Sequence, residues 1–157
     1  MTSIPTLLQI GNCFFISLLQ EAESHIRDSD WNSAYLCLEQ YGRHMTKHRE
    51  AEAELLYPRL LEQAPDLEAE TAQLLHDHDE LAKRSRLATQ HIYDKDRESA
   101  LSLMDQLIAI TGGHWLAQIQ TLFAASDTLS DQLLVQVAEK LAEAEDMPTP
   151  NSTARLH

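Results

Sequence analysis

The scarcity of helix-breaking residues constrains the fold of this chain more than any other feature. Its 157 residues include only four glycines and five prolines, and two of the glycines, Gly112 and Gly113, are adjacent. Long segments therefore contain neither of the two residue types that most disfavour a helix interior. This pattern predicts an all-α fold.

Turn and capping signals divide the chain into five helical segments. The breaks lie where Asp, Ser, Thr and Pro favour turns and helix N-caps, at residues 28–30, 64–66, 94–96 and 126–128. We expect helices over residues 5–27, 31–63, 67–93, 97–125 and 130–145. Pro58 lies inside the second of these and should kink it locally without ending it.

Four long helices joined by short turns have to run antiparallel to their neighbours. The segments therefore predict an up-down-up-down four-helix bundle, followed by a short C-terminal fifth helix. A chain of 157 residues has room for one compact domain with a sizeable core. We expect residues 1–146 to form this domain and residues 147–157 to be a flexible tail.

The acidic composition excludes several classes of partner. Twelve Lys and Arg stand against 25 Asp and Glu, and the resulting formal net charge of −13 opposes contact with nucleic acid or an anionic membrane. Cys13 and Cys37 are too few for a disulfide framework, and no apolar run approaches the roughly 20 residues of a membrane span. We therefore expect a cytoplasmic protein, with Cys37 as a small buried apolar residue.

Polar residues interrupt the apolar seams that a helical bundle buries. These seams recur at alternating steps of three and four residues. Six seam positions are polar and should point into the core: Asn12, His48, Glu52, His78, His114 and Gln118. His44 lies one turn before His48 but to the side of the seam, and we expect it to be a partly exposed flank residue.

The six polar residues should also lie at one height in the bundle. In two antiparallel helices, a pair of residues lies at the same height when the midpoint of their residue numbers falls in the connecting turn. The midpoints of Asn12 with His48, of His48 with His78 and of His78 with His114 are residues 30, 63 and 96, in or beside the predicted turns. The polar residues should therefore form one layer of the core.

An internal repeat supports this layer. A shift of 66 residues carries Asn12 to His78, His48 to His114 and Glu52 to Gln118, so two helical hairpins share one pattern. Inward-facing imidazoles and carboxylates on facing helices of a bundle are the arrangement that binds iron or manganese.

The segment HREAEAELLYP, residues 48–58, resembles the HxxxE motif of hemerythrin-like HHE cation-binding domains, with its following apolar pair, aromatic residue and proline. His78-Asp79-Glu80-Leu81 is similar to the family's third-helix motif, and His114 with Leu122-Phe123 to its fourth. The resemblance spans residues 11–123. It implies a non-haem di-iron centre for oxygen binding, sensing or iron handling, and by resemblance it assigns four ligands: His48, Glu52, His78 and His114.

Two positions depart from the family pattern. Asn12 stands where the family has its first histidine, and Gln118 where it has a second bridging glutamate. Two divalent ions would bring about +4 of charge into a low-dielectric core that holds one carboxylate. One ion, held by three imidazoles, Glu52 and water, is easier to accommodate. We expect one metal ion or an incomplete pair, with iron first and manganese or zinc as alternatives.

A metal-free reading stays open. Asn12 and Gln118 can each donate and accept hydrogen bonds, so the layer could satisfy itself and serve a bundle that acts through protein partners or as a homodimer. A bound metal would instead offer an open position to O2, NO or a small anion, by analogy with the family. No nucleophile with an oriented base, phosphate loop or nucleotide fingerprint is present, and we do not expect an enzyme.

Overall fold

The computed structural model describes residues 4–123 together with residues 132, 133, 135, 136 and 139. All five of these C-terminal residues are helical and lie within the predicted fifth helix, 130–145. The rest of that helix and the predicted tail, 147–157, lie outside the described residues. Within the described part of the chain there is no strand, as an all-α fold requires.

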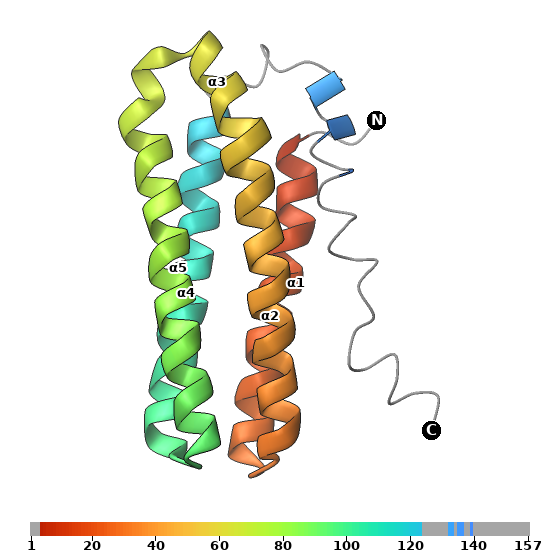
Figure 1. Ribbon diagram of the computed structural model, residues 1–157, viewed down its shortest axis with the longest axis vertical. Helices are drawn as coiled ribbons and strands as arrows, with labels where there is room; N and C mark the ends of the chain where they lie inside the picture. The colour runs from red at the N-terminus through yellow and green to blue at the C-terminus, as the bar shows by residue number, and fades with distance from the viewer. Residues whose placement is uncertain (1–3, 124–131, 134, 137–138, 140–157) are drawn as a thin grey trace.

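The described helices form an antiparallel four-helix bundle (Figure 1). The bundle consists of four long helical rods: α1, the continuous segment α2–η1–α3, α4 and α5. Each rod packs against two neighbours, and the contacts of α1 with α5 and of α2 with α4 close the ring. The predicted fold is therefore confirmed, with boundaries close to those expected from the turn signals. In chain order the elements are α1 (Ile4–Arg27), α2 (Trp31–Ala51), η1 (Glu52–Leu56), α3 (Tyr57–Gln63), η2 (Pro65–Leu67), α4 (Glu68–Tyr93) and α5 (Arg97–Phe123).

The helical winding changes about two thirds of the way along the second rod. Residues 31–63 are continuously helical, but Glu52–Leu56 is a π-helix in which the Tyr57 backbone N–H donates to the Glu52 carbonyl. Pro58 follows at once; it has no N–H to donate, and its ring crowds the carbonyl four residues earlier. The helix nevertheless continues through Pro58, as predicted, because the turn before the proline is widened into the π-helix.

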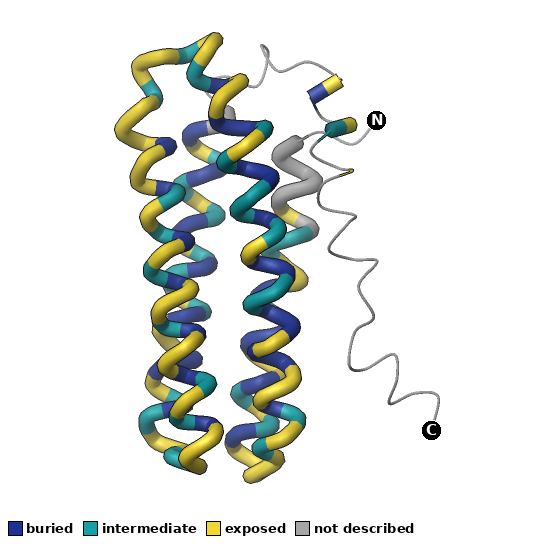
Figure 2. The backbone as a smooth tube through the Cα atoms, viewed as in Figure 1, coloured by how far each residue is buried: buried dark blue, intermediate teal, exposed yellow. Residues whose placement is uncertain are grey.

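A buried polar layer separates two apolar clusters of the core. The larger cluster fills the end of the bundle that holds the α1–α2 and α4–α5 turns. Met45 on α2, Leu81 on α4 and Leu107 on α5 are its members next to the polar layer. The smaller cluster lies beyond the layer and contains Leu56, Tyr57, Leu60, Leu74 and Leu133. Buried positions run along the inner side of each rod, including the stretch between the clusters (Figure 2).

The two helix turns at one end of the bundle repeat each other residue for residue. Ser29 and Lys95, which are 66 positions apart, both take left-handed backbone conformations, with φ of 59° and 57°. Asp30 and Asp96 follow them and cap the next helices through Oδ1, which accepts from the backbone N–H three residues later at 3.2 Å in each case. The repeat inferred from the core positions therefore extends to the turns.

Among the described residues, no helix combines the length and apolar character needed to cross a membrane.

Candidate metal centre

Glu52 is the hub of the polar layer. Its carboxylate is fully buried. Oε1 lies 2.7 Å from His48 Nε2 and accepts a hydrogen bond from Gln118 Nε2 at 2.6 Å. Oε2 lies 2.7 Å from His78 Nε2 and accepts from the Tyr57 hydroxyl at 3.2 Å. Side chains from α2, α4 and α5 therefore converge on one carboxylate, and the predicted convergence of Glu52 with His48, His78 and Gln118 is seen.

Helical spacing explains why these side chains meet. His48 and Glu52 are four residues apart and so share one face of the second rod. On α1, Gly11 lets the helix come close to the His48 ring, because a Cβ at Gly11 would lie 3.2 Å from His48 Cε1. The next residue, Asn12, is half-buried and lines the same small cavity as His48. Asn12 thus faces the layer, although Glu52 is not among the residues that line this cavity with it.

His114 completes the layer from α5 and is oriented by a neighbouring carboxylate. Its Nδ1 lies 3.3 Å from Asp77 Oδ2, and its ring packs edge-on against His78 with centroids 4.5 Å apart. Its Nε2 is buried and has no hydrogen-bond partner among the described residues. A carboxylate on one imidazole nitrogen, with the other nitrogen free, is how proteins orient a histidine ligand.

The buried environment shifts the pKa of two members of the layer. Burial lowers the pKa of His114 below its usual value, although Glu52 and Asp77 oppose the shift, so the imidazole is neutral at pH 7. Burial alone would raise the pKa of Glu52, but His48 and His78 outweigh it and hold that pKa well below its usual range. The layer therefore presents an ionised carboxylate beside a neutral imidazole.

Tyr57 keeps its proton for the same electrostatic reasons. Burial first, and then the Glu52 carboxylate, raise the pKa of Tyr57 well above its usual value. The protonated hydroxyl donates to Glu52 and accepts from Gln118 Nε2 at 2.8 Å. Tyr57 is thus a structural member of the network, a role that the sequence analysis did not assign to it.

The layer has room for one small species. A cavity in the layer leaves about 10 Å³ for the centre of a water molecule, which is close to what a single water needs. Glu52, His78 and His114 each present a ligand atom, and these atoms all lie within 4.8 Å of one another. The cavity is lined by Asn12, Phe15, Met45, His48, His78, Thr111, His114, Trp115 and Gln118.

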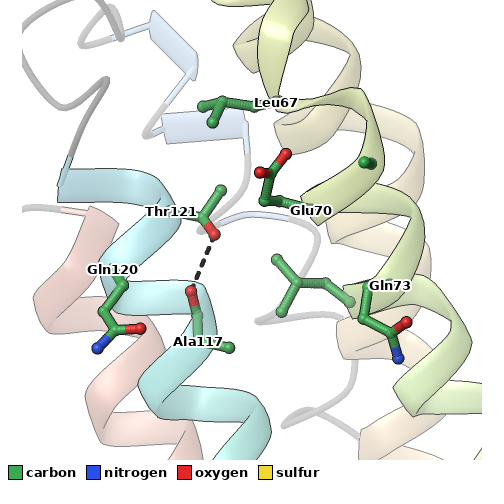
Figure 3. Close-up of a pocket in the computed structure, with 8 residues that line it drawn as sticks. Leu67, Glu70, Gln73, Ala117, Gln120 and Thr121 are labelled. Atoms are coloured by element: carbon green, nitrogen blue, oxygen red, sulfur yellow. Dashed lines mark hydrogen bonds between the residues drawn. The ribbon is translucent and has the colours of Figure 1, made fainter.

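A larger groove nearby lacks such ligands. It encloses about 540 Å³ between the start of α4 and the end of α5 (Figure 3). Among the described residues that line it, Glu70 alone is charged, and Thr121 on the opposite wall donates a hydrogen bond to the Ala117 carbonyl of its own helix at 2.9 Å. Of these two cavities, the small buried one holds the metal-binding side chains.

Asp77 and Tyr57 are the members of the site that sequence reasoning missed. Asp77 is one residue off the α4 seam, so a search for seam positions passes over it. In a regular α-helix, Tyr57 would point roughly 140° away from Glu52, five residues earlier. The π-helix brings it back, and Pro58 was the signal that the winding changes here.

The expectation for His44 was wrong. Its side chain is buried, with 8% exposed, because the Phe14 ring of α1 covers it edge-on at a centroid distance of 4.9 Å. His44 lies one turn from His48 and outside the group of ligand atoms around Glu52.

Comparison with known proteins identifies a family. The family described as Hemerythrin HHE cation binding domain matches residues 14–125, well over half of the chain. The matched range includes every residue of the polar layer except Asn12. No curated protein and no solved structure matches significantly.

Proposed function

The chain belongs to the hemerythrin HHE cation-binding domain family, and we propose that it binds a single divalent metal ion, iron in the first place, in its buried polar layer. Glu52, His78 and His114 would hold the ion, with His48 completing the donor set. We further propose that the protein binds, senses or stores rather than catalyses. When bound, the metal would offer an open coordination position to O2, NO or a small anion.

The unpartnered Nε2 of His114 is the observation that carries this proposal. A buried polar atom without a partner costs about 1–3 kcal/mol, and native proteins rarely leave one unexplained. Here the His114 imidazole is neutral and Asp77 contacts its other ring nitrogen. Ligand atoms of Glu52, His78 and His114 all lie within 4.8 Å of one another. A cation would supply the missing partner.

The charge of the layer favours one ion over two. Glu52 is the only carboxylate among the six predicted ligand positions, but Asp77 adds a second negative charge through its contact with His114. These two carboxylates balance one divalent cation in a medium where an unbalanced charge is costly. A second ion would leave about +2 of charge uncompensated. The residues present therefore fit a single ion.

The donor types narrow the choice of metal. Imidazole nitrogen and carboxylate oxygen suit iron, manganese and zinc. No cysteine is among the described residues that line the cavity, so a site selective for soft metals is disfavoured. Iron is proposed first because of the family, and manganese and zinc remain as outcomes of the test.

One observation favours a second function. Both Glu52 oxygens already have two close partners without any ion. Such a satisfied network can specify the packing of a metal-free bundle that acts through protein partners or as a homodimer. The two proposals differ in whether His114 Nε2 meets a metal.

Elemental analysis separates them. The purified, untagged protein is loaded anaerobically with Fe(II), desalted and analysed for iron, manganese and zinc per chain. We expect one iron ion per chain, lost in His114→Ala and retained in His76→Ala, whose histidine is exposed on the same helix as Asp77. No metal after loading would overturn metal binding. Two irons with an oxo-bridge absorption band would overturn the single-ion proposal.

A further inference from the structure

Three potential metal ligands converge beside the turn between α1 and α2, away from the polar layer. Glu21 and His25 lie one turn apart on α1, and Cys37 faces them from α2. Their ligand atoms all lie within 4.8 Å of one another. Cys37 is buried, His25 is half-buried and Glu21 is exposed, so an ion from solvent can reach the group.

His25 is held between two carboxylates. Its Nε2 lies 3.8 Å from Glu21 Oε1, and its Nδ1 lies 3.6 Å from Asp30 Oδ2. Both distances exceed a hydrogen bond, so hydrogen bonding alone does not account for the arrangement. Asp30 is itself fixed, because its Oδ1 caps α2 by accepting from the Ser33 N–H. Asp30 thus lies on the Nδ1 side of His25, where a carboxylate that closed to hydrogen-bond distance would support the ring as a metal ligand.

The second hairpin shows which of these residues the fold itself requires. His91 and Asp96 repeat the pair of His25 and Asp30, with Nδ1 and Oδ2 3.5 Å apart. The positions that correspond to Glu21 and Cys37, however, are leucines, Leu87 and Leu103. The His–Asp pair is therefore part of the turn. The carboxylate and the thiol are added only in the first hairpin, where the same backbone would accept apolar side chains.

We propose that Glu21, His25 and Cys37 form a second metal site, separate from the polar layer, that takes Zn²⁺ or a similar borderline divalent cation. Thiolate, imidazole and carboxylate are the zinc donors of proteins, and water would complete a tetrahedral shell. Asp30 would orient His25 without binding the ion. The ion would tie α1 to α2 beside their turn.

Binding at this site releases a proton. Burial, together with the carboxylates of Glu21 and Asp30, raises the pKa of the Cys37 thiol to about 11, so the metal-free thiol is protonated at pH 7. The metal–sulfur bond replaces the S–H bond, and the proton goes to solvent. The same carboxylates that oppose a thiolate attract a cation.

Titration with Co²⁺ tests the proposal, because a thiolate bound to Co²⁺ gives a charge-transfer absorption band and the donors of the polar layer do not. We expect this band in the full chain. Cys37→Ser should abolish it, and His25→Ala should weaken Co²⁺ affinity by at least about tenfold. The matched controls are Cys13→Ser, at an exposed cysteine, and His91→Ala, in the other turn; both should leave the band within about twofold of the parent. Absence of the band, or its survival in Cys37→Ser, would overturn the proposal.

A second measurement does not depend on replacing Cys37. The comparison is made in the His114→Ala background, where the polar layer has lost one of its proposed ligands. There Zn²⁺ should raise the melting temperature, also after the further change His91→Ala, but not after His25→Ala, because a ligand stabilises only the state that binds it. An equal rise after His25→Ala would also overturn the site.

Discussion

The two hairpins of the bundle are alike at their turns and different at the polar layer. Ser29 and Lys95 share a left-handed conformation, and Asp30 and Asp96 share a capping role. At the layer, by contrast, the first hairpin supplies the carboxylate of Glu52 where the second supplies the amide of Gln118. Backbone geometry dictates the turns, whereas the layer depends on side-chain chemistry. The two hairpins therefore build one asymmetric site between them.

The largest expected effect comes from removing the hub. Glu52→Ala should lower the free energy of unfolding by about 3–5 kcal/mol, because four buried side chains lose the carboxylate that they contact. The matched change in the second hairpin, Gln118→Ala, should cost only about 1–3 kcal/mol. Urea unfolding of both proteins in the presence of a chelator measures the difference. Equal losses would mean that the hairpins are energetically equivalent at this layer.

Gln118→Glu gives both hairpins a carboxyl group at the same position of the repeat. The second carboxyl meets Glu52 at close range, so one of the pair stays protonated, and two hydrogen bonds from the amide are lost. We expect the metal-free protein to lose about 1–3 kcal/mol of stability. The added carboxylate should also increase the amount of Fe(II) retained per chain. Unchanged iron content would show that carboxylate number does not limit the site.

The fold and most of the layer could be predicted from sequence because helical periodicity carries both. His48, Glu52, His78 and Gln118 meet as expected, since spacing fixes the face and the midpoints fix the height. The repeat was visible at the core positions for the same reason. Periodicity presumes a constant winding of the helix, and where the winding is constant, the sequence spacing predicts which side chains face the core.

The residues that were missed lie where constant winding or seam membership fails. Tyr57 reaches Glu52 only because the π-helix shifts the phase before Pro58. Asp77 contacts His114 from beside the seam, a position set by how closely α4 and α5 pack. His44 is buried by an aromatic ring of another helix, which no pattern within its own helix records.

The acid side of the stability curve should separate the two hairpins. His114 has a folded-state pKa below its ordinary value of 6.5, so the unfolded chain binds a proton that the folded protein does not. The free energy of unfolding should therefore fall as pH drops below about 6.5, by at most about 1.4 kcal/mol per pH unit for this one group. Glu52, whose folded pKa is lowered from 4.5, stabilises the fold above that value, and this contribution is lost only at lower pH, as the folded-state pKa is passed. Urea unfolding of metal-free His114→Gln between pH 8 and pH 5, relative to the parent, should show a shallower fall. An unchanged slope would assign the acid sensitivity elsewhere.

The smallest expected effects test the part of the comparison in which the hairpins are alike. Asp30→Ala and Asp96→Ala each remove one N-cap bond at the same point of the repeat. In a chelator, each should lower the melting temperature by roughly 2–4 °C, because loss of a cap leaves one helix N–H without its partner. Circular dichroism melts of the two variants should therefore nearly coincide. A clearly larger loss for Asp30→Ala without any metal would mean that Asp30 supports His25, Glu21 and Cys37 more strongly than Asp96 supports its own turn, and the turns would then differ in energy as well as in side chains.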